Sequence, residues 1–149
     1  MLSRRSLLLA AAASAMLNPA AAATARPLKV YKTADCTCCE GWVAAMARAG
    51  FAPESVASDN IAAVWRRHGV PDSLSSCHLG LVGSYVLVGH VPPADALRLL
   101  KERPKAIGLT VPGMPWGSPG MEAPDRSRQR FDTLVLLPGG RTRVFARNA

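Results

Sequence analysis

Three of the four cysteines in this sequence fall within four residues, Cys36-Thr37-Cys38-Cys39, and the fourth is Cys77. The three lie where a predicted strand gives way to a predicted helix. The unpaired N–H groups and partial positive charge of a helix N-terminus stabilise thiolate over thiol. Crowded thiolates repel one another, and either a disulfide or a soft cation such as Cu(I) or Zn(II) removes that repulsion.

The spacing of the cysteines favours copper over zinc. It lacks the paired two-residue gaps of a zinc ribbon. Sulfurs that bridge several Cu(I) ions would use so crowded a set better than a single zinc ion would. We therefore predict a copper site, with Cu(I) as the expected oxidation state, at Cys36, Cys38, Cys39 and Cys77.

Two other readings of the cysteines stay open. Cys36 and Cys39 have the C-x-x-C spacing of a thiol–disulfide oxidoreductase, although Cys38 between them could trap a mixed disulfide. Alternatively, pairs such as Cys36–Cys39 and Cys38–Cys77 would make a non-enzymatic binding module held by disulfides. A domain of this size does not need disulfides to fold, which argues against the disulfide-stabilised module. The residues do not decide whether the protein is an enzyme.

Four further residues are candidate ligands. His78 directly follows Cys77, and on one strand the two side chains should point to opposite faces. His90 ends the next predicted strand, so both histidines are candidates to bind the metal or to support its ligands. Met114 and Met121 lie in a loop rich in Gly and Pro, where a thioether could bind Cu(I) or simply pack the loop onto the domain.

Hydrophobic periodicity predicts the elements that position these residues. We expect strands at 28–33 and 51–57, helices at 40–50 and 94–102, and a hairpin of 77–82 with 85–91. A further helix should follow a cap at Ser58 or Asp59 and end at His68. This β-α-β-α-β-β-α order is that of an α/β, thioredoxin-like domain. A Gly/Pro/Met loop at 108–122 and a second hairpin, 131–137 with 141–147, complete the chain.

The first 25 residues have the composition of a secretory signal peptide. Arg4 and Arg5 precede a short apolar run and a small-residue tract, and the pair also resembles a twin-arginine signal. We therefore predict an exported, periplasmic protein with one domain at 26–149 and no membrane span in the mature chain. The formal net charge is +8, but the arginines are dispersed and aromatic residues are few, which argues against nucleic-acid binding.

The sequence resembles the periplasmic copper-resistance CopG-like family of predicted metal-binding proteins. The resemblance rests on ordered segments that span the mature chain: Tyr31-Lys32-Thr33, the C-x-C-C motif with Trp42, Leu74 with Ser76-Cys77-His78, Gly89-His90-Val91-Pro92, and Gly108-Leu109 through Gly120-Met121-Glu122. It implies a thioredoxin-like fold, copper ligation by the four cysteines, and a Pro/Met loop close to the site. Its expected role is copper resistance by sequestration, transfer to other periplasmic copper-handling proteins, or Cu(I)/Cu(II) cycling.

Overall fold

The computed structural model describes residues 25–148, so the predicted signal peptide lies almost entirely outside the described residues. The strands are β1 (Arg26–Lys32), β2 (Phe51–Ala57), β3 (His78–Val82), β4 (Tyr85–Gly89), β5 (Gly108–Val111), β6 (Phe131–Leu136) and β7 (Thr142–Asn148). The helices are α1 (Thr37–Arg48), α2 (Ile61–Arg67) and α3 (Pro93–Glu102), with 3₁₀ turns η1 (Asp72–Leu74) and η2 (Pro138–Gly140). No helix among residues 25–148 is both long and apolar enough to cross a membrane.

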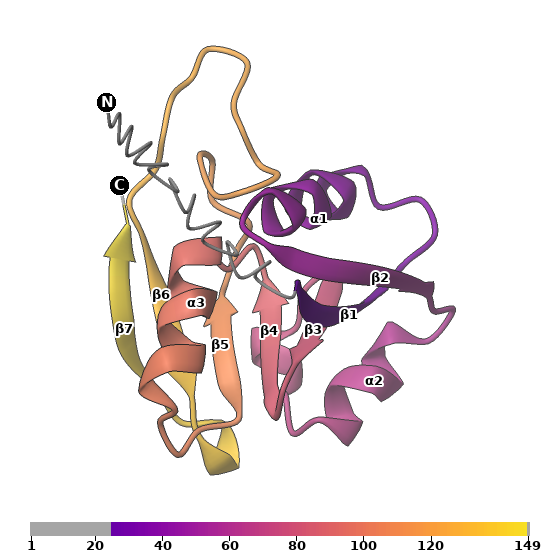
Figure 1. Cartoon of the computed structure of the whole chain (residues 1–149), viewed down its shortest axis with the longest axis vertical. Coiled ribbons are helices and arrows are strands. Elements are labelled where there is room, and N and C mark those ends of the chain that lie inside the picture. Colours follow the sequence, from indigo (N-terminus) through magenta and orange to yellow (C-terminus); the bar gives the residue numbers. More distant parts are fainter. Residues whose placement is uncertain (1–24, 149) are drawn as a thin grey trace, which may run out of the picture.

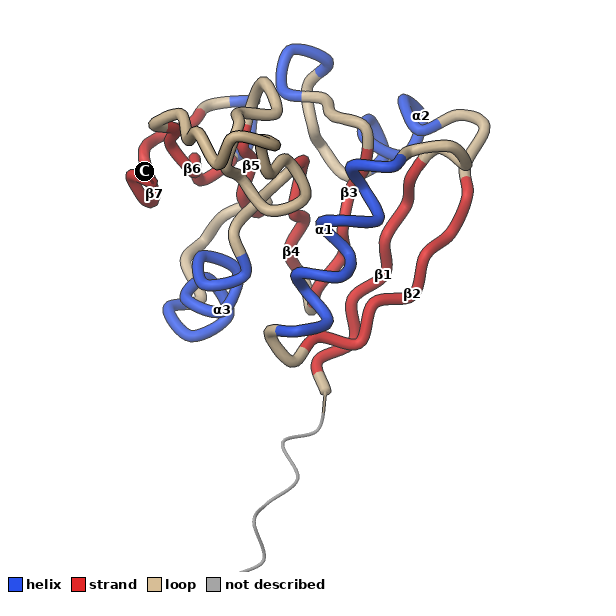
Figure 2. The backbone as a smooth tube through the Cα atoms, turned by 90° about the horizontal axis from the view of Figure 1, so that it is seen from above, coloured by secondary structure: helices blue, strands red, loops and turns tan. Residues whose placement is uncertain are grey.

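All seven strands form one mixed sheet in the order β2-β1-β3-β4-β5-β6-β7 (Figure 1). The pairs β1–β2 and β4–β5 are parallel and the other four are antiparallel. Helices α1 and α3 cover one face of the sheet and α2 covers the other (Figure 2). The structure therefore has three layers, with one apolar core on each side of the sheet.

The core between α1 and the sheet fixes the start of α1, which carries the cysteines. Leu28, Val30 and Lys32 alternate along β1 and point toward this face, as strand geometry requires. Trp42 and Met46, one helical turn apart on α1, are fully buried against it. Burying residues of this size contributes on the order of 2 kcal/mol each, so the helix is firmly held on the sheet.

The predicted mixed α/β class, the β-α-β-α-β-β-α order and the closing hairpin are confirmed. The prediction that 108–122 is entirely loop is wrong, because its first four residues form the buried strand β5. Gly108 makes this possible, since a Cβ there would lie 1.8 Å from the Val86 carbonyl oxygen of β4. Two boundaries also differ: α1 begins at Thr37 rather than at 40, and Asn60 rather than Ser58 or Asp59 caps α2 by accepting from the Ala63 N–H at 3.0 Å.

Candidate metal centre

The three clustered cysteines form the start of α1. Cys36 is the N-cap residue, with extended backbone angles, and Cys38 and Cys39 lie in the first helical turn. Cys36 and Cys39 are joined by a disulfide, whereas Cys38 and Cys77 are free thiols. No side chain of the described residues caps this helix end, so its partial positive charge faces the sulfur atoms.

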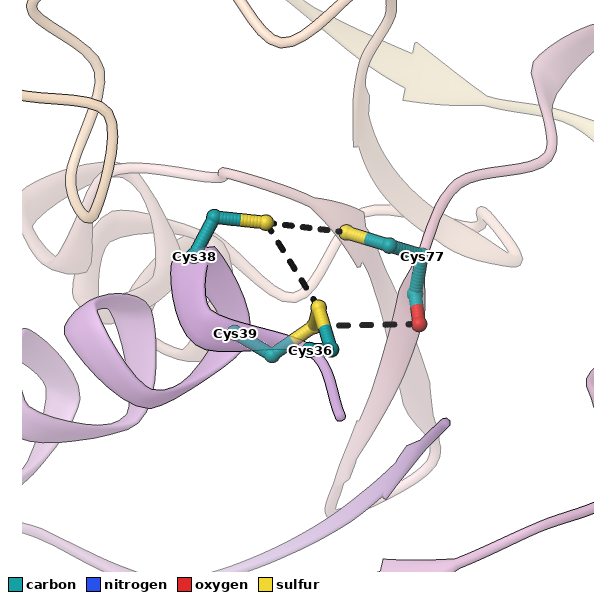
Figure 3. Close-up of side chains that lie close together, drawn as sticks. All are labelled: Cys36, Cys38, Cys39 and Cys77. Carbon is teal, nitrogen blue, oxygen red and sulfur yellow. Dashed lines mark hydrogen bonds between the residues drawn. A yellow bond between two sulfur atoms is a disulfide. The ribbon is translucent and has the colours of Figure 1, made fainter. Parts of the chain in front are cut away.

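Cys77, the residue before β3, brings the fourth sulfur to the same place (Figure 3). Its Sγ lies 3.7 Å from Cys38 Sγ, which in turn lies 3.5 Å from Cys36 Sγ. Cys39 Sγ lies 3.8 Å from the Cys77 carbonyl oxygen. All four sulfurs fall within 4.8 Å of one another, a spacing that could hold metal. Cys39 is fully buried, but Cys38 and Cys77 are partly exposed and give access from solvent.

Two histidines extend the site beyond the sulfurs. Cys77 Sγ lies 3.4 Å from His78 Nδ1 and 3.8 Å from His90 Nε2, and the three residues form a second group whose ligand atoms converge within 4.8 Å. The prediction that Cys77 and His78 point to opposite faces is wrong. Cys77 precedes β3, which begins at His78, so the alternation of a strand does not apply to the pair.

The histidine rings are packed in the protein interior. The His78 ring lies 4.4 Å from the Trp42 ring and 5.1 Å from the His90 ring, measured between centroids. Trp42 is itself fixed by donating its indole N–H to the Val91 carbonyl at 2.9 Å. Burial, and then the neighbouring His90, lowers the pKa of His78 to about 3, and burial lowers the pKa of His90 as well. Both rings are therefore neutral near pH 7, the form that binds metals.

Burial also affects the remaining thiol of this group. It raises the pKa of Cys77 to about 11, with the neighbouring Cys38 adding to the effect. Cys77 is therefore protonated near pH 7 in the metal-free protein. A metal ion that binds it must displace the proton, so binding becomes easier as the pH rises.

The Gly/Pro/Met loop packs directly onto the site. The Pro119 carbonyl accepts a hydrogen bond from the His90 Nδ1–H at 2.8 Å. The next residue, Gly120, lies against the first turn of α1. A Cβ there would be 2.6 Å from the Cys38 carbonyl oxygen and 2.5 Å from the backbone nitrogen of Trp42. Only glycine allows this contact, and its φ of +85° is in the left-handed region as well.

The two methionines of this loop have different surroundings. Met121 is half-buried beside Gly120, and its N–H and carbonyl bond to Ser118 and Gly117 at 2.8 Å each. Met114 is 44% exposed and has a φ of +47°. The structure thus places Met121 next to the segment that touches α1 and leaves Met114 at the surface. Metal ligation by either methionine stays a prediction.

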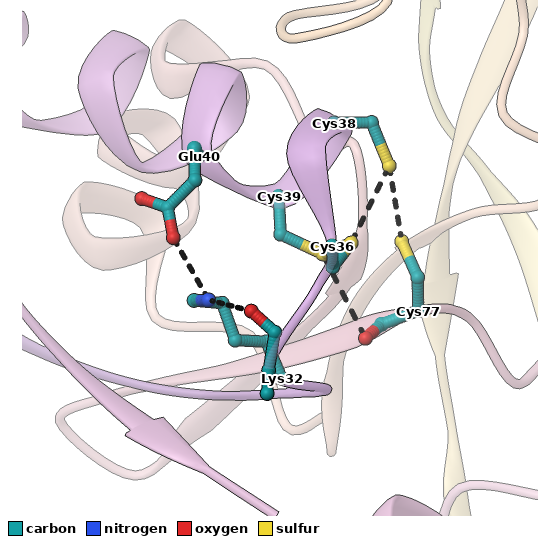
Figure 4. A network of polar contacts seen from close by, with 7 residues as sticks. Lys32, Cys36, Cys38, Cys39, Glu40 and Cys77 are labelled. Atoms are coloured by element: carbon teal, nitrogen blue, oxygen red, sulfur yellow. Dashed lines mark hydrogen bonds and ion pairs between the residues drawn. A yellow bond between two sulfur atoms is a disulfide. The ribbon is translucent and has the colours of Figure 1, made fainter.

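A buried lysine near the cysteines was not among the site residues predicted from the sequence. Lys32, the last residue of β1, has a side chain only 8% exposed; it forms an ion pair with Glu40 of α1 at 2.8 Å and donates to the Ala34 carbonyl at 3.4 Å (Figure 4). The ion pair compensates the charge of the buried ammonium and joins the end of β1 to the first turn of α1. The position of Lys32 was available from the sequence, since it continues the alternation of the buried residues Leu28 and Val30.

Two solved structures are similar to this chain over nearly their whole length. Both are titled copper resistance protein CopG, Form 2 and Form 1. Each is 37% identical over 83% of this chain, covering 98% and 97% of the matched chains with a TM-score of 0.77. This chain belongs to the CopG family. A family model described as "Protein of unknown function, DUF411" also matches residues 74–121, the segment from η1 to Met121. No protein with a curated description matches the sequence.

The segment that the family model matches contains only part of the candidate metal centre. The matched segment 74–121 contains Cys77, both histidines and the Pro/Met loop, whereas the C-x-C-C motif lies outside it. In three dimensions the two parts meet at one point, where Cys38 faces Cys77. The matched structures thus support a link to copper resistance, and the geometry of the four sulfur atoms supports a metal-binding cysteine cluster.

Proposed function

We propose that this protein is an exported copper-binding protein that holds Cu(I) through Cys36, Cys38, Cys39 and Cys77. The observation that carries the proposal is the convergence of four sulfur atoms, from α1 and from the residue before β3, within 4.8 Å of one another. Thiolates are soft ligands that select Cu(I). Four sulfurs so close together can bridge neighbouring ions, so we expect more than one copper per chain.

The full ligand set exists only in the reduced protein. Two electrons and two protons convert the Cys36–Cys39 disulfide into two thiols, which then join Cys38 and Cys77. The helix N-terminus favours negative charge at this end of α1. This feature favours the formation of thiolates as copper displaces the protons of the thiols.

The proposed role is copper resistance in the periplasm, by sequestration, by transfer to other copper-handling proteins or by Cu(I)/Cu(II) cycling. The partial exposure of Cys38 and Cys77 supports exchange with a partner, because an incoming ligand can reach copper there. The chain contains only three histidines and five methionines, which argues against high-capacity storage.

The test is copper stoichiometry on reduced protein under anaerobic conditions. After Cu(I) loading and desalting, we expect more than one copper per chain, with all four thiols protected from alkylation. Cys36→Ser, Cys38→Ser, Cys39→Ser and Cys77→Ser should each lower that number. His68→Ala, at the end of α2 and outside both ligand groups, is the matched control and should leave it unchanged. Undiminished copper in all four serine variants would overturn the proposal.

Export is tested separately. If residues 1–25 act as a signal peptide, the mature protein isolated from the periplasm should begin near Arg26. Replacing Arg4 and Arg5 with Lys should block export by the twin-arginine route but have little effect on an ordinary secretory signal. Full-length protein found only in the cytoplasm would contradict this part of the proposal.

The Cys36–Cys39 disulfide also favours a second candidate, a thiol–disulfide oxidoreductase. In this reaction, Cys36 thiolate attacks a substrate disulfide and releases one thiolate; Cys39 then attacks the mixed disulfide, releases the second thiolate and forms the bond seen here. Metal-free, reduced protein should then reduce a model disulfide, Cys36→Ser should be inactive, and Cys38→Ser should remain active. Absence of turnover in the metal-free protein would exclude this candidate.

A further inference from the structure

The disulfide divides the metal-binding groups into two sets. It consumes Cys36 and Cys39, so half of the four-sulfur set is lost in this state. The second set, Cys77, His78 and His90, contains neither of these residues and keeps all its ligand atoms within 4.8 Å of one another. The state described by the structure therefore retains one complete group of potential metal ligands.

The orientation of the His90 ring prepares it to bind metal. Its Nδ1 lies 2.8 Å from the Pro119 carbonyl oxygen, which can only accept a hydrogen bond, so the proton of the neutral ring is on Nδ1. The lone pair is then on Nε2, and Nε2 is the atom that lies 3.8 Å from Cys77 Sγ. A hydrogen bond from the far nitrogen to a backbone carbonyl is the usual way in which proteins orient a metal-binding histidine.

His78 provides a second nitrogen close to the same thiol. Its ring is fully buried and its Nδ1 lies 3.4 Å from Cys77 Sγ. Its Nε2 has no hydrogen-bond partner among the described residues, although buried polar atoms normally have one. Thus one histidine is oriented by the loop, and the other is a buried ring whose Nδ1 lies beside the thiol.

The distances fit ligands that share one ion. With metal–sulfur bonds of about 2.3 Å and metal–nitrogen bonds of about 2.0 Å, a sulfur and a nitrogen at tetrahedral positions lie about 3.5 Å apart. The observed separations of 3.4 and 3.8 Å bracket this value. Small movements of the side chains would therefore suffice to bring the three atoms into one coordination shell.

We propose that Cys77, His78 and His90 form a separate copper subsite that stays competent when Cys36 and Cys39 are joined by their disulfide. This inference rests on the proposed function, because the subsite is the part of the proposed copper centre that still binds copper in the disulfide-linked protein. The Cys36–Cys39 disulfide would lower the copper content to one ion per chain without emptying the centre. It would also change the ligands from sulfur alone to one sulfur and two nitrogens, a set that suits both Cu(I) and Cu(II).

The experiment compares the two states of the same mature protein. Disulfide-linked protein, with Cys36 and Cys39 resistant to alkylation, is loaded anaerobically with Cu(I) from a weak chelator in the absence of a reductant. We expect one retained copper, with X-ray absorption showing about two nitrogen scatterers and one sulfur scatterer. The reduced protein should retain more copper, with a shell dominated by sulfur.

Variants test the ligands in the disulfide-linked state. His90→Ala and Cys77→Ser should weaken copper binding at least tenfold, and His68→Ala should not change it. If His90→Ala does not fold, ¹⁵N NMR of the unmodified protein gives the same information, because copper should shift the His90 Nε2 resonance far more than that of Nδ1. An unchanged Nε2 resonance on loading would overturn the inference.

The failure of this inference is distinguishable from failure of the proposed function. Reduced protein that binds several copper ions, together with disulfide-linked protein that binds none, would overturn the separate subsite and leave the four-cysteine proposal intact. Copper retained equally by Cys77→Ser and His90→Ala would also overturn the subsite. No copper in either state would overturn both proposals.

Discussion

Cys77 combines an accessible position with an unreactive thiol. Burial raises its pKa to about 11, and the thiolate is the species that reacts with alkylating agents. At pH 8 only about one Cys77 side chain in a thousand is then ionised, compared with at least a tenth for a free cysteine. In the metal-free, disulfide-linked protein we therefore expect iodoacetamide to modify Cys77 about 100-fold more slowly than free cysteine.

Mass spectrometry of each cysteine over a range of pH checks this expectation. The alkylation rate of Cys77 should still be rising above pH 10, because the thiol ionises only near its raised pKa. A rate that levels off near pH 9 would show that burial does not have this effect.

The chemistry of the individual residues was largely predictable from the sequence, but their grouping was not. The cysteine set and His78 and His90 could be named from residue type and order along the chain. The Cys77 and His78 side chains would point to opposite faces if β3 began at Cys77, but the strand begins at His78. Hydrophobic periodicity cannot place a strand end to within one residue. The hydrogen bond from His90 to Pro119 joins residues 29 positions apart, and no local pattern indicates it.

At the scale of elements, the contact between the Pro/Met loop and α1 can be isolated by two matched glycines. Gly120 and Gly113 have similar positive φ angles, +85° and +81°. A Cβ at Gly120 would overlap the backbone of Cys38 and Trp42, whereas a Cβ at Gly113 would meet nothing within 4 Å among the described residues. Both alanine variants have the same backbone strain. The difference between their free energies of unfolding therefore measures the effect of the close contact alone.

We expect Gly120→Ala to be destabilised by about 1–3 kcal/mol more than Gly113→Ala, the range for overpacking at a tight contact. Urea denaturation of both variants provides the comparison. Because the loop must move away from α1, Gly120→Ala should also bind copper more weakly, whereas Gly113→Ala should bind normally. Equal stability of the two variants would mean that the loop is not held against the helix.

The order of elements followed from hydrophobic periodicity, and the errors occurred where local signals are weak. Strand β5 has four residues next to a proline-rich segment, too short for alternation to be recognised, and it forms because β4 lies beside it. The start of α1 was placed too late because cysteine is a poor helix former and a rare N-cap. Residue Pro53 of β2 did not prevent a strand, since β2 lies at the sheet edge.

At the scale of the whole molecule, a buried polar network joins α3 to the closing hairpin. Asp95 of α3 accepts a hydrogen bond from the Thr133 hydroxyl of β6 at 2.6 Å and another from the Asn148 amide of β7 at 3.4 Å. Both Asp95 and Thr133 are buried. Asp95→Ala should therefore reduce the free energy of unfolding by about 1–3 kcal/mol, the cost of unsatisfied buried polar groups.

Glu102→Ala is the matched control on the same helix. Its exposed ion pair with Arg98 should contribute no more than about 0.5 kcal/mol. Chemical denaturation measures both changes, and the copper stoichiometry of both variants should equal that of the unmodified protein. A loss of copper in Asp95→Ala at full stability would show that the hairpin takes part in the metal centre.

The two edges of the sheet also determine how copies of the protein behave toward one another. A free strand edge is a template for pairing with another chain, and this sheet has two of them, β2 and β7. In β2, Pro53 lacks the N–H that a neighbouring strand would need. In β7, the pairing with β6 is irregular between Thr133 and Leu134 of β6. The Arg98 side chain also donates a hydrogen bond to the Phe145 carbonyl of β7 at 2.6 Å. Arg143 and Arg147 add positive charge to the same strand. Such edges resist amyloid-like stacking, so copies of the protein should stay dispersed even at high concentration.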